Sequence, residues 1–195
     1  ELVAAARRGV VVRILSDQLR DGVTAEFLAR LALTHVNLEK RIYNPFLGDA
    51  VMADIDYLWG TFFHFNVLNH RMHCKMLLVD GRVGIVGGRN VQNRYFDHDP
   101  DFDYIDRDVL VVGPTVKQMS ASFEEYWESR IVAPLGQLSD VRDYLVREVA
   151  PLPLDPLSVA VKERFGALSE RASDAAYIGQ TFVDTAFKVE RMAFT

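Results

Sequence analysis

A histidine and a lysine two residues apart are the side chains of this sequence that best suit phosphate chemistry. They open the pattern His-x-Lys-x4-Asp-x6-Gly-Gly-x-Asn, which is formed by His73, Lys75, Asp80, Gly87, Gly88 and Asn90. On a β-strand, side chains two residues apart project from the same face, so the His73 imidazole and the Lys75 ammonium would share one pocket. The ammonium would hold an anion such as phosphate and favour the neutral, nucleophilic ring. The pair therefore suits attack on the phosphorus of a phosphodiester.

The second half of the pattern supplies hydrogen-bond donors to the same site. Gly87 and Gly88 allow backbone amides to approach a ligand closely, and Asn90 adds a side-chain donor that can hold the non-bridging oxygens of phosphorus. The alternative is a strand whose histidine and lysine face solvent and whose Asp80-Gly81 is only a turn. The spacing of the first three residues can arise by chance, but coincidence becomes rare once Gly-Gly-x-Asn is added, so the catalytic interpretation is favoured.

The pattern resembles the HKD motif of the phospholipase D superfamily. Other stretches within residues 1–150 resemble the first half of bacterial cardiolipin synthases, closest to the C type: Tyr-Asn-Pro-Phe at 43–46, Asn-His-Arg-Met-His at 69–73, Gly-Gly-Arg-Asn at 87–90, Tyr-Phe at 95–96, Asp-x-Asp-Val-Leu at 106–110 and Tyr-Trp at 126–127. The resemblance implies two HKD motifs that meet across a pseudo-twofold axis, without a metal or cofactor. One histidine forms a phosphohistidine and the other protonates the leaving alcohol. Cys74 and the Gln-Asn-Arg segment at 92–94 depart from the family pattern and leave the substrate open.

Roles follow from the resemblance residue by residue. It makes His73 the nucleophile or the general acid, Lys75 and Asn90 phosphate ligands, and Asp80 a member of the motif with a mainly orienting role. The chain holds one such motif, because its other histidines (His35, His64, His70 and His98) lie in no second His-x-Lys-x4-Asp context. We therefore expect a second HKD half, either in a longer parent chain, which we favour, or in an identical subunit.

A histidine with this role needs an acceptor on its second ring nitrogen. Asp106 is our candidate, because it begins a predicted strand over 106–112 that should lie beside the motif, and because an acidic residue at this point in the family approaches the motif histidine. Asp108 would project to the same side and is the reserve choice. The alternative is that both are solvated charges at a strand edge.

The elements expected to position these residues predict an α/β fold. Thr24 can cap the first helix through its side chain, and Asp80-Gly81 can form a hairpin turn. We expect a mixed β-sheet flanked by helices on both sides, a phospholipase D-like lobe over residues 1–150, and a helical linker or the start of a second lobe over 151–195, after a proline-rich break. The predicted strands cover 10–15, 40–43, 72–79, 83–86 and 106–112, and the predicted helices cover 24–37, 49–65 and 115–130.

Composition narrows the possible functions. With 195 residues, 49% of them hydrophobic, the chain can bury a real core, and its formal net charge of -5 argues against nucleic acid as a partner. The single cysteine, Cys74, excludes an internal disulfide, and we expect it to be a small core residue on the face opposite His73. No apolar run approaches the ~20 residues that cross a bilayer. The start, without Met, reads as part of a longer chain.

Two weaker features have competing interpretations. The acidic run at 97–103 could be imagined as a calcium loop, but it lacks the EF-hand spacing and the closing Glu, so a solvated loop at the pocket rim is favoured. An aromatic cluster could dip into lipid beside the site, although core packing is the commoner fate of such residues. Its members are Tyr57, Trp59, Phe62, Phe63 and Phe65.

The leading hypothesis is phosphatidyl transfer from a phospholipid to a glycerol-type alcohol, carried out by a bacterial enzyme bound peripherally at the cytoplasmic membrane. A first alternative is a phosphodiesterase or nuclease of the same superfamily, in which water resolves the phosphohistidine. A second alternative is a non-catalytic lobe that binds phosphate or lipid and dimerises. The motif alone does not choose the acceptor alcohol.

Overall fold

A computed structural model describes residues 1–18, 23–53, 55, 58, 70–90, 92–96, 101–153 and 159–189. The chain forms two compact units, Glu1–Leu152 and Pro153–Thr195. Every candidate site residue lies in the first unit. None of the helices in the described parts of the chain combines the length and the apolarity needed to cross a bilayer.

The first sheet contains the first two predicted strands, joined by the predicted helix at 24–37 in a β-α-β unit. Strand β1 (Val12–Asp17) pairs in parallel with β2 (Leu38–Tyr43), and β2 pairs antiparallel with β6 (Val132–Pro134). Helix α2 (Ala25–Ala32) connects β1 to β2, and the Thr24 hydroxyl oxygen accepts the Phe27 amide at 3.1 Å, which confirms the predicted cap. The helix ends before the predicted residue 37, because a local turn follows in which the His35 ring accepts the Asn37 amide.

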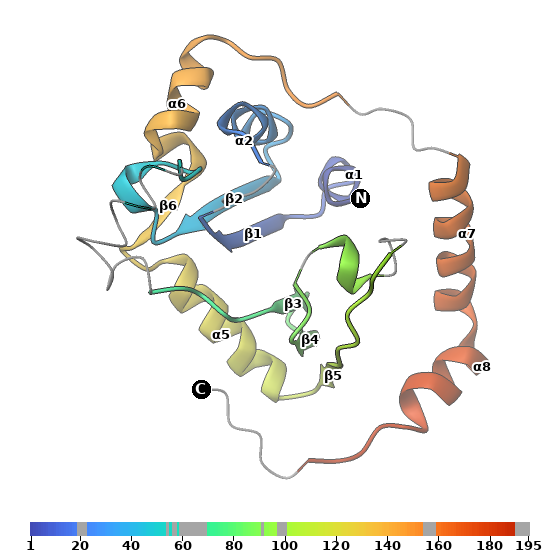
Figure 1. The fold of residues 1–195 in the computed structure, drawn as a ribbon. Helices are drawn as coiled ribbons and strands as arrows, with labels where there is room; N and C mark the ends of the chain where they lie inside the picture. The colour runs from blue at the N-terminus through green and yellow to red at the C-terminus, as the bar shows by residue number, and fades with distance from the viewer. Residues whose placement is uncertain are drawn as a thin grey trace. The chain divides into compact units, whose positions relative to one another are not determined.

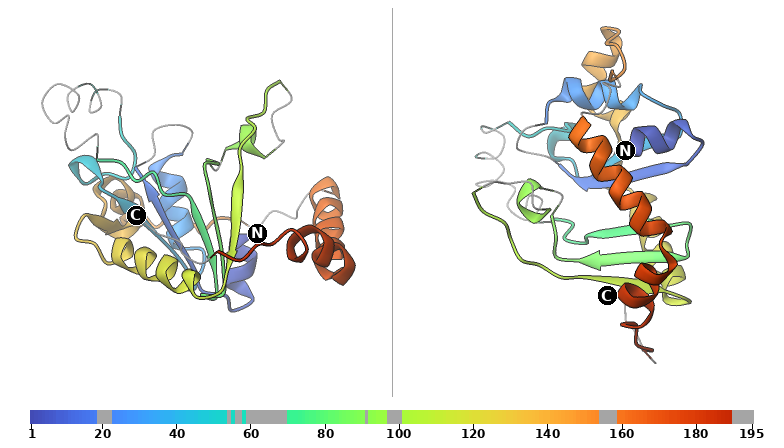
Figure 2. Two further views of the ribbon diagram at one scale, coloured as in Figure 1. Left: turned by 90° about the horizontal axis from the view of Figure 1, so that it is seen from below. Right: turned by 90° about the vertical axis from the view of Figure 1, so that its right-hand side faces the viewer.

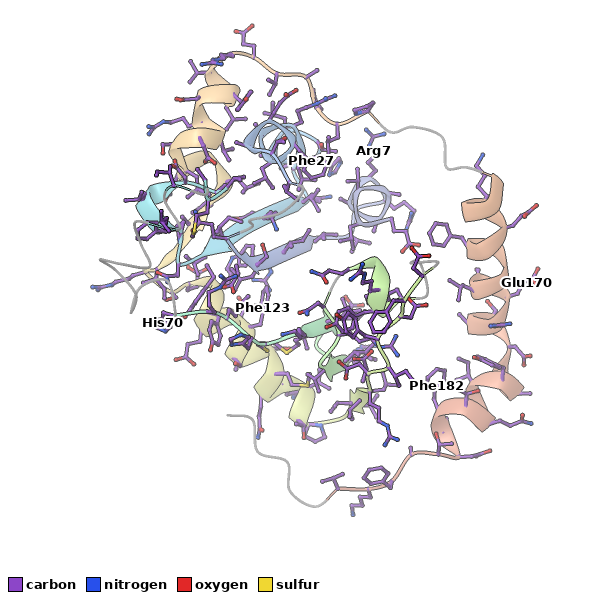
Figure 3. The ribbon with its side chains drawn as sticks, in the orientation of Figure 1. Arg7, Phe27, His70, Phe123, Glu170 and Phe182 are labelled. Atoms are coloured by element: carbon purple, nitrogen blue, oxygen red, sulfur yellow. The ribbon has the colours of Figure 1, made fainter. Side chains whose placement is uncertain are left out.

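Helices cover both faces of this sheet (Figure 1). Helix α2 and α6 (Ser139–Val146) enclose one apolar core with β2, made of Leu28, Ala29, Ile42, Ala50, Leu135, Leu138 and Val141. Helix α5 (Thr115–Trp127) covers the other face, where the Arg41 guanidinium lies 4.3 Å from the Trp127 ring centre. Phe123 of the same helix, labelled in Figure 3, stacks on Trp127. The predicted α/β class, with helices on both sides of the sheet, is confirmed.

The second sheet carries the predicted hairpin. Strands β3 (Met76–Val79), β4 (Val83–Gly87) and β5 (Asp108–Val112) are antiparallel neighbours in that order (Figure 2). Asp80 and Gly81 have φ of 52° and 61°, and the Arg82 amide donates to the Val79 carbonyl at 3.0 Å. Positive φ at both central residues is what the hairpin turn with matching twist requires.

Helix α5 also supports this second sheet. Met119 is fully buried and lies against Gly84 of β4, and Val111 of β5 is buried on the same side. The strands thus form two three-stranded sheets that share α5, one mixed and one antiparallel, in place of the single mixed sheet expected.

Three strands start later than predicted: β1 begins at Val12 instead of residue 10, and the two strands beside the candidate site also begin late. Strand β3 begins at Met76 instead of residue 72, and β5 begins at Asp108 instead of residue 106. For β3 the cause is visible, because the Met72 amide donates to the Asp17 carboxylate at 3.0 Å instead of joining a ladder. His73, Lys75 and Asp106 therefore lie on irregular backbone that leads into the strands.

The remaining elements are short or lie in the second unit. The first unit also contains α1 (Leu2–Arg7) and the 3-10 turns η1 (Phe46–Gly48), η2 (Asn93–Tyr95) and η3 (Leu135–Gln137). The second unit contains α7 (Val159–Ser173), α8 (Ala175–Ile178) and the π-turn η4 (Gly179–Val183). The helix predicted over 49–65 and its aromatic cluster lie largely outside the described residues.

Candidate active site

His73 and Lys75 lie together just before β3. His73 is exposed and Lys75 is half-buried. The Lys75 ammonium donates to the His73 carbonyl oxygen at 3.0 Å, so the charge is held beside the histidine backbone. The Lys75 carbonyl oxygen in turn accepts the Gly87 amide at 3.4 Å, which places the first glycine of the pattern opposite the lysine. An exposed histidine, a lysine that bonds its carbonyl oxygen, and a glycine amide therefore lie together at the open end of the hairpin.

The two glycines allow an acidic segment to approach the hairpin. A Cβ on Gly88 would lie 2.5 Å from Asp106 Oδ2 and 2.9 Å from Oδ1. A Cβ on Gly87 would overlap a carboxylate oxygen of Asp108 and lie 2.8 Å from the Arg107 carbonyl oxygen. Any larger residue would push this segment away. The half-buried Asp106 is thereby held against the Gly-Gly wall, and its hydrogen bond to His73 stays a prediction.

Arg89, between the glycines and Asn90, is a cation that sequence reasoning did not assign to the site. Its Nε lies 3.1 Å from Asp108 Oδ2, and its Nη1 donates to the Tyr95 carbonyl oxygen at 3.3 Å. The Asn90 amide nitrogen donates to the Tyr95 hydroxyl at 3.3 Å. Asp108, the reserve acceptor for His73, is therefore engaged by Arg89. A basic residue inside Gly-Gly-x-Asn was the signal that could have identified it.

Asp80 is the motif member that the structure does not bring to this group. It forms the turn at the far end of β3, whereas His73 precedes the near end. The four residues of β3 alone span ~13 Å at the usual rise of a strand. Asp80 therefore shapes the hairpin from a distance, and its side chain does not line the same pocket.

Cys74 was predicted to be buried, and this is wrong: the residue is exposed. It precedes the first paired residue of β3, so it does not enter the alternation that would direct it into a core. Partial desolvation nevertheless raises the pKa of the Cys74 thiol. The Lys75 ammonium acts in the opposite direction, but its effect is smaller. A thiol with a raised pKa is a poor nucleophile at neutral pH, so Cys74 does not compete with His73.

The segment that leads to His73 is fastened from the first sheet. Asp17, the last residue of β1, accepts the Met72 amide at 3.0 Å and the Arg71 Nε at 2.9 Å. Asn44, directly after β2, donates to the His70 carbonyl oxygen at 3.1 Å. These residues were missed, although polar side chains at the carboxyl ends of neighbouring parallel strands are a recognised signal of a site.

The described residues offer no ready metal centre. Among them, no three His, Cys, Asp or Glu side chains are grouped so as to hold an ion. Residues 97–100 of the acidic run lie outside the described part of the chain.

Comparison with known proteins bears on the same residues. The profile of the family described as "Cardiolipin synthase, PLD-like domain" matches residues 1–127, which include all the candidate site residues. Cardiolipin synthase C of Escherichia coli K12 is 35% identical over 164 residues, which are 84% of this chain and 33% of that protein. Cardiolipin synthase A of Pseudomonas putida GB-1 is 38% identical over 103 residues, or 50% of this chain and 21% of its own length.

An uncharacterized protein of Helicobacter pylori 26695 is also 35% identical, over 140 residues that cover 71% of this chain and 27% of the relative. The match thus spans between a fifth and a third of the length of these curated relatives. The matched region holds the His-Lys pair, the glycine wall and the acidic segment in one hairpin-based site. By this match, the chain belongs to the family of cardiolipin synthase, phospholipase D-like domains.

Proposed function

We propose that this chain is one catalytic lobe of a phosphatidyltransferase of the cardiolipin synthase type, which acts on phospholipid at a membrane surface. The observation that carries the proposal is the exposed His73 with the Lys75 ammonium held 3.0 Å from its carbonyl oxygen and a glycine amide opposite. Family membership gives this group its phosphodiester substrate class. A glycerol-type acceptor alcohol agrees with the names of the relatives.

The proposed chemistry has two displacements at phosphorus. A ring nitrogen of His73 attacks, a P–N bond forms, and the P–O bond to the leaving alcohol breaks while an acid on the opposite side protonates that oxygen. A second alcohol then attacks the phosphohistidine, loses its proton to the same acid, and releases the ring. Lys75, Asn90 and the amide of Gly88 stabilise the non-bridging oxygens, while the Gly87 amide bonds the Lys75 carbonyl oxygen. His73 and the acid exchange these roles if His73 protonates the leaving group.

The acid in this scheme is the histidine of a second HKD half. Each half presents its histidine from one side of phosphorus, so one half alone provides one of the two groups. We propose that the partner belongs to a longer parent chain, with an identical subunit as the alternative. Activity of the 195-residue chain that rises with the square of its concentration would favour the identical subunit. A monomer that turns over at the rate of the full-length protein would contradict the need for a second half.

The test is His73→Asn in the full-length protein, assayed with vesicles of phosphatidylglycerol and product analysis by mass spectrometry. Loss of attack and of proton transfer should reduce transfer by about 1000-fold or more, with unchanged circular dichroism. His70→Asn is the matched control, because His70 is an exposed histidine three residues earlier and should stay active. Substantial turnover by His73→Asn would remove His73 from the mechanism, and release of phosphatidic acid alone would favour hydrolysis.

A further inference from the structure

Asp17 makes two different bonds to the chain just before His73. Its side chain is 19% exposed, and its two oxygens have separate partners. Oδ1 accepts the backbone amide of Met72 at 3.0 Å, and Oδ2 accepts the Arg71 Nε at 2.9 Å. A carboxylate that accepts a backbone amide forms a charge-assisted bond, which is stronger than a neutral one. Asp17 thus fixes the backbone one residue before His73.

Asn44 fixes the same segment from the neighbouring strand. Its side chain donates to the His70 carbonyl oxygen at 3.1 Å, and the His70 ring meets the Tyr43 ring edge-on at 6.0 Å. Asn44 has a φ of 46°, a conformation that asparagine tolerates better than most residues. Its own amide donates to the Ile131 carbonyl oxygen at 2.8 Å, which ties it to the chain before β6. The anchor for residues 70–72 is therefore the rigid first sheet.

His73 itself lies between this anchor and the second sheet. Regular pairing of β3 starts only at Met76, and the Gly87 amide bonds Lys75 at the long distance of 3.4 Å. The 3.0 Å bond at Met72 is thus the nearest constraint that the first sheet places on the histidine, beside the Lys75 bond to the His73 carbonyl oxygen. It constrains the backbone from which the His73 side chain extends.

We propose that Asp17 is a positioning residue of the site, which holds His73 at the attacking distance from phosphorus through the Met72 amide. This inference rests on the proposed function and deepens it. Displacement of a reacting group by about 1 Å can lower turnover by about 100-fold without weakening substrate binding. Asp17 touches no reacting atom and no phosphate oxygen in this scheme, so its effect falls on kcat and leaves KM unchanged.

The test compares Asp17→Ala and Asp17→Asn in the full-length protein. Asp17→Ala removes both bonds, and kcat should fall about 100-fold with KM unchanged within about twofold. Asp17→Asn keeps an oxygen that can accept the Met72 amide, so it should retain at least about a tenth of the kcat. Arg71→Gln removes only the ion-pair partner and should stay within about threefold of the parent kcat, since the Arg71 side chain is 46% exposed.

Asp140→Ala is the matched control. The Asp140 carboxylate also accepts backbone amides from a distant segment, those of Ala50 at 2.8 Å and Val51 at 3.0 Å, in addition to the amide of its neighbour Val141. It therefore bonds residues 50–51 instead of residues 70–72. A similar loss of Tm is expected from both alanine variants, but kcat per folded molecule should fall only for Asp17→Ala. Equal losses of kcat would reduce the role of Asp17 to general stability and overturn the proposal.

Hydrogen exchange in the full-length protein separates this proposal from the proposed function. The Met72 amide should exchange at least about tenfold faster in Asp17→Ala than in the parent or in Asp140→Ala. Unchanged exchange would refute the bond, and faster exchange with unchanged kcat would refute the positioning role. If His73→Asn stays active, the proposed function fails, and with it the positioning role, whether or not the Met72 amide is released.

Discussion

Lys40 on β2 offers a direct test of how burial acts on charge in this fold. By strand alternation it shares a face with Leu38 and Ile42, which are both buried in the core. Its ammonium is partly buried and donates to the Ser16 hydroxyl at 2.6 Å. Removal from water disfavours the charged form, and it lowers the pKa of Lys40 from 10.5 to about 8. We predict that Lys40→Met stabilises the protein at pH 7.

The magnitude follows from that pKa. A fall from 10.5 to about 8 corresponds to about 3 kcal/mol of lost interaction with water for the charged lysine. The variant loses the bond to Ser16, worth about 1 kcal/mol, and the partial exposure of the ammonium reduces the gain further. A net stabilisation of about 1 to 2 kcal/mol remains. Methionine has a similar length and can fill the same space.

The sign of the pH dependence provides a second check. In the folded state Lys40 loses its proton near pH 8, and in the unfolded state near 10.5, so the unfolded state binds more protons between these values. Stability contributed by this residue therefore rises with pH across that window. The stability advantage of Lys40→Met over the parent should therefore shrink as the pH is raised from 7 to 10, because the parent lysine becomes neutral over that range.

The assay is urea unfolding of the parent and the variant at several pH values, with the difference in free energy of unfolding as the readout. Taking the difference cancels the titration of other groups, such as Tyr43 and Cys74, whose raised pKa values act in the opposite direction. The exposed Lys117→Met should show neither effect. A Lys40→Met variant that is less stable at pH 7, or a difference independent of pH, would refute the reasoning.

Two further predictions concern the glycine wall and the cap of α2. Gly88→Ala should lower kcat by about tenfold or more, because the new methyl group would lie 2.5 Å from Asp106 Oδ2 and displace the carboxylate. Parent-like kinetics would show that activity does not require Asp106 to lie against Gly88. Thr24→Ala should lower the free energy of unfolding by about 1 kcal/mol through loss of the bond to the Phe27 amide, whereas Thr24→Ser should retain most of it in the same denaturation assay.

Local chemistry explains which parts of the fold could be predicted from the sequence. The Thr24 cap and the Asp80-Gly81 turn depend on residues within three positions of each other, and both are present as predicted. The start of β3 depends on Asp17, which lies 55 positions before Met72 in the sequence. The Asp17 carboxylate accepts the hydrogen bond of the Met72 amide. No periodicity encodes that contact. The exposure of Cys74 follows from the same late start, so one long-range bond accounts for both errors.

The glycines of the site were predicted for one reason and have a second role in the structure. Close approach of amides to phosphate was the expectation for Gly87 and Gly88. In the folded chain the space above them is occupied by the carboxylates of Asp106 and Asp108. An acidic wall against the glycines would oppose an anionic substrate unless cations balance it, and Arg89 pairs with Asp108 at 3.1 Å. Lys75 and Arg89 thus supply local positive charge at the site, although the chain as a whole has a net charge of -5.

The spacing of the motif acquires a geometric meaning from the hairpin. The four residues between Lys75 and Asp80 are those of β3, and the six before Gly87 are the rest of the turn and four residues of β4. The chain runs through four residues of β3, three residues of the turn and four residues of β4. It thereby returns to a position opposite Lys75, where the Gly87 amide donates to the Lys75 carbonyl oxygen. A one-residue insertion in β4 would move Gly87 out of this register and turn the following side chains to the other face. Asp80 can therefore be essential to the pattern although it lies at the opposite end of β3 from His73, because the turn it forms determines which residues meet at the open end.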